Sequence, residues 1–178
     1  MKRTIPLFAA GLLAGGNALA AGPAVIGSIY APDVDVGAAS ASPDAITVEV
    51  RQPLNRHFWI GAALATSLGS DQVAPGVTAE VGNSLTFNLG VSSEFAHHVE
   101  GYAYVGYGKA AVDVSGPGAS SIDGKGVAWG IGADFLLNDH LLVDVGYASL
   151  FDDDMEDSTG TQFATAIAGP RVGLGFRF

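Results

Sequence analysis

The chain contains no cysteine in its 178 residues. Exported proteins often rely on disulfides, so packing and hydrogen bonds must provide the stability here. The length suits a single domain.

Basic residues are also scarce. Eight Lys and Arg stand against eighteen Asp and Glu, for a formal net charge of −10. Lys2 and Arg3 lie in an N-terminal segment that we expect to be removed, which leaves 6 − 18 = −12 for the mature chain. Because phosphate binding depends on Lys and Arg, the composition argues against nucleic acid as a partner.

The first residues have the pattern of a secretory signal. Lys2 and Arg3 precede an apolar stretch at 5–13, and Ala18-Leu19-Ala20 places small residues at −3 and −1. We therefore expect a cleaved signal peptide at 1–20 and a mature domain at 21–178. The alternative, a membrane anchor, needs about 20 apolar residues, and this stretch is too short.

Long apolar runs are missing after Ala20, yet the mean hydropathy is positive, at +0.33. A membrane protein without apolar helices can be a closed barrel, in which each strand pairs its backbone N–H and C=O groups with its neighbours.

Alternation of side chains supports this interpretation. The segment 84–95 alternates large apolar residues with small or polar ones, and the segments 125–137 and 141–151 repeat the pattern. Period two over such lengths indicates strands. The second face is dominated by Gly, Ala and Ser with isolated charges, which suits a narrow lumen, whereas a soluble sandwich would carry a solvating polar face.

Turn signals predict eight strands, at 25–36, 45–52, 57–69, 81–95, 100–114, 125–137, 141–151 and 162–178. Short connections at 53–56, 96–98 and 138–140 alternate with longer Gly-, Ser-, Pro- and Asp-rich segments at 37–44, 70–80, 115–124 and 152–161. Outer-membrane barrels have such periplasmic turns and extracellular loops. Pro32 in the first strand and Pro170 in the last cannot donate to a ladder, and a bulge at Pro170 would be one way to accommodate it.

The fold class predicted is therefore all-β: an eight-stranded antiparallel up-and-down transmembrane β-barrel, preceded by a cleaved signal peptide. The predicted location is the outer membrane of a Gram-negative bacterium, surrounded by its lipid.

The C-terminal strand ends with an aromatic residue. Leu174, Phe176 and Phe178 share one face, which resembles the signal that the barrel insertion machinery recognises in its clients. We expect this machinery and periplasmic chaperones to be partners during biogenesis. An ordinary amphipathic last strand would not require the terminal Phe.

From Tyr102 onward the sequence resembles the OmpX/Ail group of small outer-membrane proteins. The resemblance covers the C-terminal half well and the N-terminal half only by strand count. It implies an eight-stranded barrel, and members of the group include adhesins and serum-resistance factors. The motifs that carry it are Val105-Gly106-Tyr107-Gly108-Lys109, Trp129-Gly130-Ile131-Gly132-Ala133-Asp134-Phe135, Val143-Asp144-Val145-Gly146-Tyr147 and the ending at 173–178.

Charges predicted to face the lumen are the first candidate site. They could form an ion path or an interior network, and the network is favoured because an eight-stranded barrel has room only for side chains. Unpaired buried ions cost several kcal/mol, so each needs a partner. The residues are Glu49, Arg51, Glu94, Lys109, Asp113, Asp134, Asp144, Arg171 and Arg177.

The acidic run at 152–157 could bind a divalent cation weakly, because hard cations take carboxylate oxygens. It lacks the Gly and the ligand spacing of an EF-hand loop, so a solvated loop of like charges is the favoured interpretation.

Histidines bear on enzymatic activity. His57, His97, His98 and His140 all fall at or near the predicted periplasmic turns. A catalytic triad needs a His within hydrogen-bond reach of its nucleophile, and no such set can be assembled toward the extracellular rim. We expect no enzymatic activity, no metal site and no cofactor.

The aromatic residues are assigned mostly to the bilayer, since interfacial girdles use such rings. Trp59 is the exception, because its register points inward. The residues assigned to the lipid face are Tyr102, Tyr104, Trp129, Tyr147, Phe151, Phe176 and Phe178.

Three functions remain as hypotheses: a non-enzymatic surface protein whose loops serve adhesion, binding or envelope integrity; a narrow channel for small solutes or ions; and a lipid-modifying enzyme. The first is favoured, with an extracellular ligand that the sequence does not identify. We expect a monomer.

Overall fold

The computed structural model describes residues 22–36, 39–116, 121–156 and 160–178. The predicted signal peptide lies outside these residues. The described residues hold no helix long and apolar enough to span a membrane.

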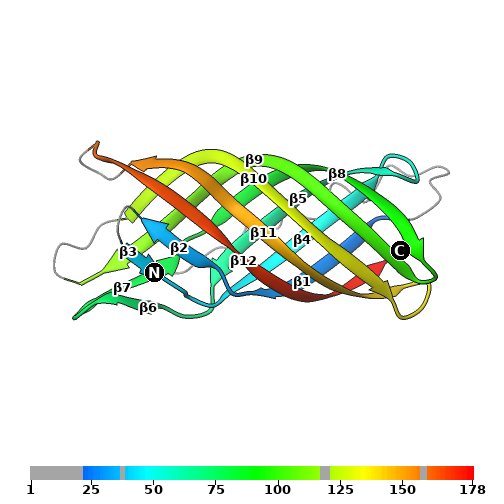
Figure 1. Ribbon diagram of the computed structural model, residues 1–178, viewed down its shortest axis with the longest axis horizontal. Helices are drawn as coiled ribbons and strands as arrows, with labels where there is room; N and C mark the ends of the chain where they lie inside the picture. Colours follow the sequence, from blue (N-terminus) through cyan, green and yellow to red (C-terminus); the bar gives the residue numbers. More distant parts are fainter. Residues whose placement is uncertain (1–21, 37–38, 117–120, 157–159) are drawn as a thin grey trace.

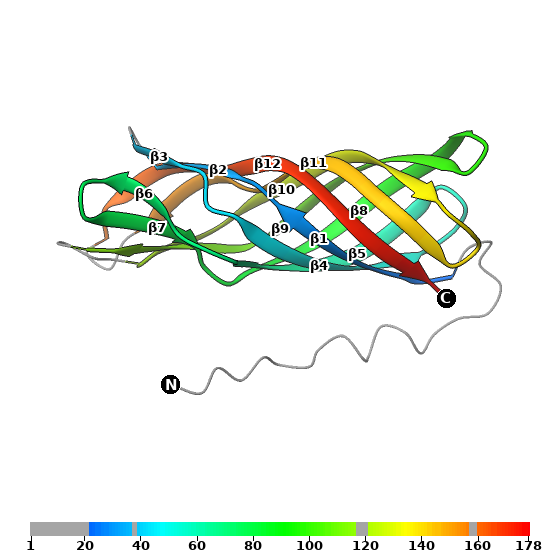
Figure 2. The ribbon, with the colours of Figure 1, turned by 90° about the horizontal axis from the view of Figure 1, so that it is seen from below.

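The strands form an elongated antiparallel barrel (Figures 1 and 2). Eight positions follow one another around it, in the order β1-β4-β5-β8-β9-β10-β11-β12, and β1 pairs with β12 to close the wall. This confirms the predicted closed barrel of eight strands. The strands are β1 (Ala24–Tyr30), β2 (Asp33–Val36), β3 (Ala39–Ala41), β4 (Ala45–Pro53), β5 (Phe58–Ser67), β6 (Asp71–Ala74), β7 (Val77–Val81), β8 (Ser84–Ala96), β9 (Val99–Ser115), β10 (Ser121–Leu136), β11 (Leu141–Glu156) and β12 (Gln162–Arg177).

Three short turns lie at the end of the barrel that holds the C-terminus (Figure 1). In two of them an Asn side-chain oxygen accepts hydrogen bonds from two backbone N–H groups. Asn55 accepts from His57 and Phe58, and Asn138 accepts from His140 and Leu141. The third is the His97–His98 turn, where His98 has a φ of 63°. Short turns mark the periplasmic end of such barrels, so the opposite end is extracellular.

The extracellular end is extended by four short strands, β2, β3, β6 and β7. β2 pairs with β12 and β3, while β7 pairs with β6 and β9. The segments 37–44 and 70–80 were predicted as loops. That prediction was wrong for β3, β6 and most of β7, because hairpins here satisfy the backbone with ladder hydrogen bonds.

Between β3 and β6 the extended wall has a seam. Among the described residues no ladder joins these two strands. Ser42 bridges it: its backbone N–H donates to Asp71 Oδ2 at 2.9 Å, and its hydroxyl donates to Asp33 Oδ1 at 2.7 Å. Side-chain hydrogen bonds therefore hold the wall together at this place.

The outer surface is apolar and the inner surface polar along β8. Leu85, Phe87 and Leu89 are exposed, whereas Thr86 and Asn88 are buried. These are the faces predicted from the alternation. Exposed large hydrophobic residues continue around the barrel, which is the arrangement expected where a wall meets lipid.

Three aromatic residues predicted to face lipid are instead inside. Tyr102 is 4% exposed and Tyr104 8%. A side chain at the facing Gly130 or Gly132 would overlap these rings, so the neighbouring glycines make room for them in the lumen. Phe151 is fully buried because the β10–β11 and β11–β12 pairings both shift register near it, and a bulge changes the face on which later residues lie.

The acidic run was also predicted wrongly as a loop. Residues Asp152 to Glu156 belong to β11, with Asp152 opposite Ala166 and Glu156 opposite Gln162 on β12. Asp157 lies outside the described residues. Strand pairing continues here because β12 provides a partner along the whole run.

Candidate functional site

The lumen contains a network of five charged side chains from four strands. Arg51 on β4 contacts three carboxylates: its Nη1 lies 2.8 Å from Asp134 Oδ2, and its Nη2 lies 3.2 Å from both Glu49 Oε2 and Asp144 Oδ2. Arg171 on β12 lies 2.9 Å from Glu49 Oε2 and 3.1 Å from Asp144 Oδ1. All five side chains are at most 7% exposed, so the network crosslinks β4, β10, β11 and β12 inside the barrel.

Aromatic rings pack against both arginines. The Arg51 guanidinium lies 4.2 Å from the ring centroid of Tyr102 and 5.0 Å from that of Trp59. Arg171 donates a hydrogen bond to the Tyr102 hydroxyl at 2.9 Å. Cation–π contacts strengthen when water is excluded, so the rings both fill the lumen and stabilise the charges. Trp59 has the inward position predicted for it and is 4% exposed.

A second ion pair lies nearer the periplasmic mouth. Arg177 Nη2 is 2.8 Å from Glu100 Oε2, and Nη1 is 3.2 Å from Oε1, so the pair is bidentate. Glu100 is absent from the charges predicted to face the lumen. Glu100 pairs with Asp134 on β10. Because Asp134 was predicted to face the lumen, this pairing could have identified Glu100 as a second inward charge.

Of the nine charges predicted to face the lumen, the structure brings Glu49, Arg51, Asp134, Asp144 and Arg171 into one network and places Arg177 beside Glu100. The other three lie elsewhere. Glu94 is exposed at the periplasmic end of β8, in register with Glu100.

Lys109 and Asp113 do not face the lumen, and their predicted inward register was wrong. The neighbouring Ala110 and Val112 are fully buried, and Lys109 is exposed and forms an ion pair with Asp123 at 2.7 Å. β9 carries aromatic side chains on both faces, Tyr104 inside and Tyr107 outside, so its alternation alone is ambiguous. Because Tyr102 and Tyr104 face inward, the alternation along β9 places Lys109 and Asp113 on the outer face.

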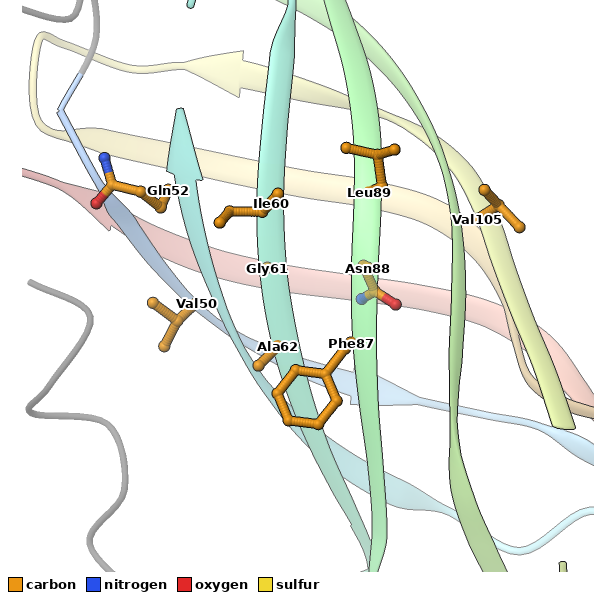
Figure 3. Close-up of a pocket in the computed structure, with 9 residues that line it drawn as sticks. All are labelled: Val50, Gln52, Ile60, Gly61, Ala62, Phe87, Asn88, Leu89 and Val105. Atoms are coloured by element: carbon orange, nitrogen blue, oxygen red, sulfur yellow. The ribbon is translucent and has the colours of Figure 1, made fainter. Parts of the chain in front are cut away.

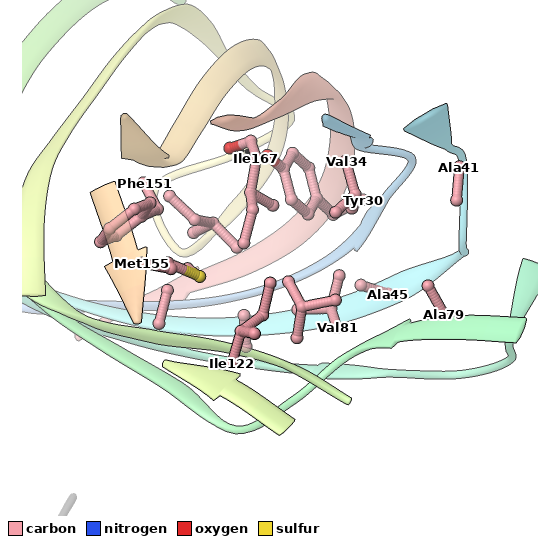
Figure 4. Packing of buried hydrophobic residues seen from close by; sticks show 14 of the residues in the cluster. Tyr30, Val34, Ala41, Ala45, Ala79, Val81, Ile122, Phe151, Met155 and Ile167 are labelled. Carbon is pink, nitrogen blue, oxygen red and sulfur yellow. Dashed lines mark hydrogen bonds between the residues drawn. The ribbon is translucent and has the colours of Figure 1, made fainter. Parts of the chain in front are cut away.

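Above the charged network, the extracellular half of the lumen is filled by apolar side chains (Figure 4). Phe151, Met155, Ile167 and Val112 are fully buried there, and Val34 is 2% exposed. The cluster also includes Tyr30, Ala41, Ala45, Ala65, Ala79, Val81, Ala110, Ile122, Ala148 and Leu150.

The Tyr30 hydroxyl reaches the backbone of two strands, with Ala148 O at 3.0 Å and Ile167 O at 3.1 Å. The extracellular half of the lumen is thus closed by apolar packing, within which the Tyr30 hydroxyl is held by hydrogen bonds to the backbone.

The four histidines lie at the periplasmic turns. His140 Nδ1 is 3.0 Å from the backbone oxygen of Arg177, and its ring stacks on Phe176. Within the described residues, no group of three or more His, Cys, Asp or Glu is arranged to hold a metal ion. Two of these rings, His57 and His140, contact backbone oxygens beside their turns, which is a structural role.

One hollow lies on the outer wall. A groove of about 420 Å³ crosses β4, β5, β8 and β9, where Gly61 and Ala62 stand between larger neighbours (Figure 3). Val50, Ile60, Phe87, Leu89 and Val105 line it, together with Gln52 and Asn88. Because most of these side chains belong to the lipid-facing surface, the groove opens toward the bilayer.

Several solved barrels share this fold. The chain is similar to Ail, the attachment invasion locus protein of Yersinia pestis, with 17% identity, a TM-score of 0.61, and coverage of 89% of this chain and 99% of Ail. Neisserial surface protein A gives 12% identity, a TM-score of 0.70, and coverage of 88% and 97%. OprG of Pseudomonas aeruginosa gives 16% identity, a TM-score of 0.62, and coverage of 89% and 96%. These values show a common fold.

No curated protein sequence matches the chain. The family model described as the outer membrane protein beta-barrel domain matches residues 5–178. With the closed wall, the apolar outer surface and the neighbouring solved barrels, this match shows that the chain belongs to the outer membrane protein β-barrel domain family and resides in the outer membrane of a Gram-negative bacterium.

Proposed function

We propose that the protein is a non-enzymatic barrel with a closed lumen, whose function lies at its extracellular end. The observation that carries this is the filling of the lumen at two successive levels, charged and then apolar. An ion entering from the periplasm would have to displace the partners of Arg51 and then cross a packed apolar section. Desolvating a charge in such surroundings is costly, which argues against the alternative of a narrow channel.

Conductance in a planar lipid bilayer tests the closed lumen. We expect the refolded wild-type barrel to give no steady openings, with folding checked by its heat-dependent gel mobility. Lumen variant Arg171→Ala and outer-face variant Lys109→Ala form a matched pair. Steady wild-type openings that change in Arg171→Ala but not in Lys109→Ala would support the channel and contradict the proposal.

The charge of the extracellular end indicates the chemistry of a partner. Ail has been crystallised with the heparin analogue sucrose octasulfate, a polyanion. Here the extracellular half carries mainly carboxylates, with Lys109 and Lys125 as its basic residues. Complementary charge favours a cationic partner. The carboxylates are Asp33, Asp35, Asp44, Asp71, Glu80, Asp113, Asp123, Asp152, Asp153, Asp154 and Glu156.

A decalysine peptide is a suitable probe of this surface. We expect binding that weakens as salt rises, because exposed charges are screened, and that falls in a variant with Asp152, Asp154 and Glu156 changed to Asn, Asn and Gln. A variant with Glu94→Gln and Asp139→Asn at the periplasmic end serves as control. Equal binding by both variants would contradict a cationic partner for the extracellular end.

The proposal includes export and insertion. Cleavage after Ala20 is checked by the mass of the protein isolated from membranes. Leu174 is 69% exposed, Phe176 43% and Phe178 59%, so this face is available for contact with the insertion machinery. Removing Phe178 should lower the yield of inserted barrel, while refolding in detergent stays near wild type. Unchanged insertion would leave the last strand without a signalling role.

A further inference from the structure

The two lysines of the described residues lie side by side on the outside of the barrel. Lys109 on β9 is paired directly with Lys125 on β10, and both side chains are exposed. Of the other basic residues, Arg51 and Arg171 are inside, Arg177 lies at the periplasmic mouth and Arg56 in a periplasmic turn. The basic charge of the extracellular outer surface is therefore concentrated at one cross-strand pair.

Placing two ammonium groups opposite each other is unfavourable unless something compensates, since like charges directly opposite destabilise a sheet. Asp123 compensates Lys109 through its 2.7 Å ion pair. Lys125 makes no ion pair within the part of the chain that the structure describes. Its ammonium is free to bind an anion, and Lys109 can share one with it.

Carboxylates limit the direction from which an anion can approach. On the outer face of β11, beside β10, lie Asp152, Asp154 and Glu156. On the other side of the lysines, the apolar residue Leu85 of β8 pairs with Lys109, and the carboxylates on that side, Glu80 of β7 and Asp113 of β9, lie further toward the extracellular end. An anion is therefore favoured on the β8–β9 side.

The lysines lie at the boundary of the apolar band. One pair toward the periplasm, Tyr107 lies opposite Val127, and the next pair is Val105 with Trp129, all exposed on the same face. In the extracellular direction the outer positions become Asp123 and Asp113. Headgroups of the outer leaflet meet the protein at this level.

The groove on the outer wall lies below the lysines on the β8–β9 side. Val105, at its edge, is four residues from Lys109 along β9, a separation of about 13 Å at 3.3 Å per residue. Half of a hydrocarbon core of about 30 Å is 15 Å, so an acyl chain from a headgroup at Lys109 reaches the groove within its own leaflet.

We propose that Lys109 and Lys125 bind the phosphate of an outer-leaflet lipid, and that an acyl chain of the same lipid occupies the groove floored by Gly61 and Ala62. Two independent features support one ligand: an adjacent pair of cations at headgroup level, and a hollow within acyl reach on the side away from the β11 carboxylates. The occupant is a lipid with a phosphate headgroup.

Quenching of Trp129 tests this proposal. Trp129 lies on the outer face opposite Val105, whereas Trp59 is inside the lumen. The barrel is reconstituted in phosphatidylcholine vesicles that contain a small fraction of either phosphatidic acid or phosphatidylcholine with brominated acyl chains. We expect brominated phosphatidic acid to quench the fluorescence more strongly at equal fraction.

Headgroup variants form the first arm. One Lys near an anionic surface contributes a factor of about five in affinity, so Lys125→Gln should lower the enrichment of phosphatidic acid about fivefold, and Lys109→Gln with Lys125→Gln should remove it. Arg56→Gln, which removes a cation from a periplasmic turn, should leave it unchanged. Equal quenching by the two brominated lipids in wild type, or an unchanged excess in the double lysine variant, would overturn the proposal.

Groove variants form the second arm. Ala62→Leu fills the groove and should reduce the excess quenching, while Ala133→Leu adds the same bulk elsewhere on the outer face and should not. Heat-dependent gel mobility confirms that each variant is folded. If Ala62→Leu keeps the full excess, the acyl part of the proposal is wrong, because the lysines alone then account for the enrichment.

Discussion

The two halves of the lumen are filled by different chemistry. Toward the periplasm, Arg51 and Arg171 hold three carboxylates, and each charge depends on particular partners. Toward the extracellular end, Phe151, Met155 and Ile167 pack without charge. A charge network fixes the relative positions of strands through directional bonds, whereas apolar packing depends mainly on shape and volume. The stability of the charged half should therefore depend strongly on single functional groups. The apolar half should be more tolerant of substitution.

The largest effect is expected from Arg51→Met, which breaks the charged half. Asp134 would lose its ion-pair partner, and Glu49 and Asp144 would keep only Arg171. Leaving a buried charge without a partner costs about 3–5 kcal/mol. Urea-induced unfolding in lipid vesicles measures this change, with Arg56→Met at the exposed turn as control. A loss equal to that of the control would mean that the network contributes little to stability.

A smaller effect is expected when the apolar half is broken by Ile167→Ala. Ile167 is fully buried in the cluster, and the lost contacts and cavity should cost about 2–3 kcal/mol. The same unfolding measurement applies. Ile167→Leu keeps the volume and should cost less than about 1.5 kcal/mol; if it costs as much as Ala, shape matters more here than volume.

Tyr30→Phe sharpens the comparison, because Tyr30 brings one directional bond into the apolar half. Removing the hydroxyl leaves Ala148 O and Ile167 O without its hydrogen bond, and should cost about 1 kcal/mol. Hydrogen exchange of the β11 and β12 amides provides a local measurement beside global unfolding. Unchanged exchange would show that the phenol acts by packing alone.

The smallest effect concerns the seam between β3 and β6, which lies in the wall around the apolar half of the lumen. The backbone N–H groups of Ser42 and Gln72 donate to the Asp71 carboxylate and hold its pKa below the usual value. Because the pKa is lowered by folding, the stabilisation is present above the unfolded value of about 3.9 and is lost as the pH falls through the folded value. Proteolysis at β6–β7 should increase on acidification in wild type, and Asp71→Ala should show the increase already at neutral pH.

How far the sequence predicted the fold varies from strand to strand. On β8 and β10 one face is large and apolar and the other small, so alternation placed Phe87 and Trp129 outside correctly. On β9 both faces carry tyrosines, and the choice of face depended on Gly130 and Gly132 of the next strand, which a single strand does not reveal. Phe151 depended on a bulge, and bulges arise from pairing between strands.

The charged half of the lumen was more predictable than the apolar half. A buried Glu49 or Asp144 requires a partner, so the predicted inward register also implied ion pairs, which the structure shows. The apolar cluster depends on residues from hairpins that were predicted as loops, such as Ala41 and Ala79. Nothing in their residue types distinguishes an extended barrel wall from a solvated loop.

The closure of the barrel has a consequence for the order of folding. Ala24 pairs with Arg177 and Tyr30 with Arg171, so the wall is completed by contacts between the two extremes of the described chain. Long-range pairings are slow to form, because much chain must be ordered before they are made. Until β12 arrives, β1 presents unpaired N–H and C=O groups that hydrocarbon cannot satisfy. A ribosome that stalls before the last strand would thus release a polypeptide that has nearly every strand and no stable place in the membrane.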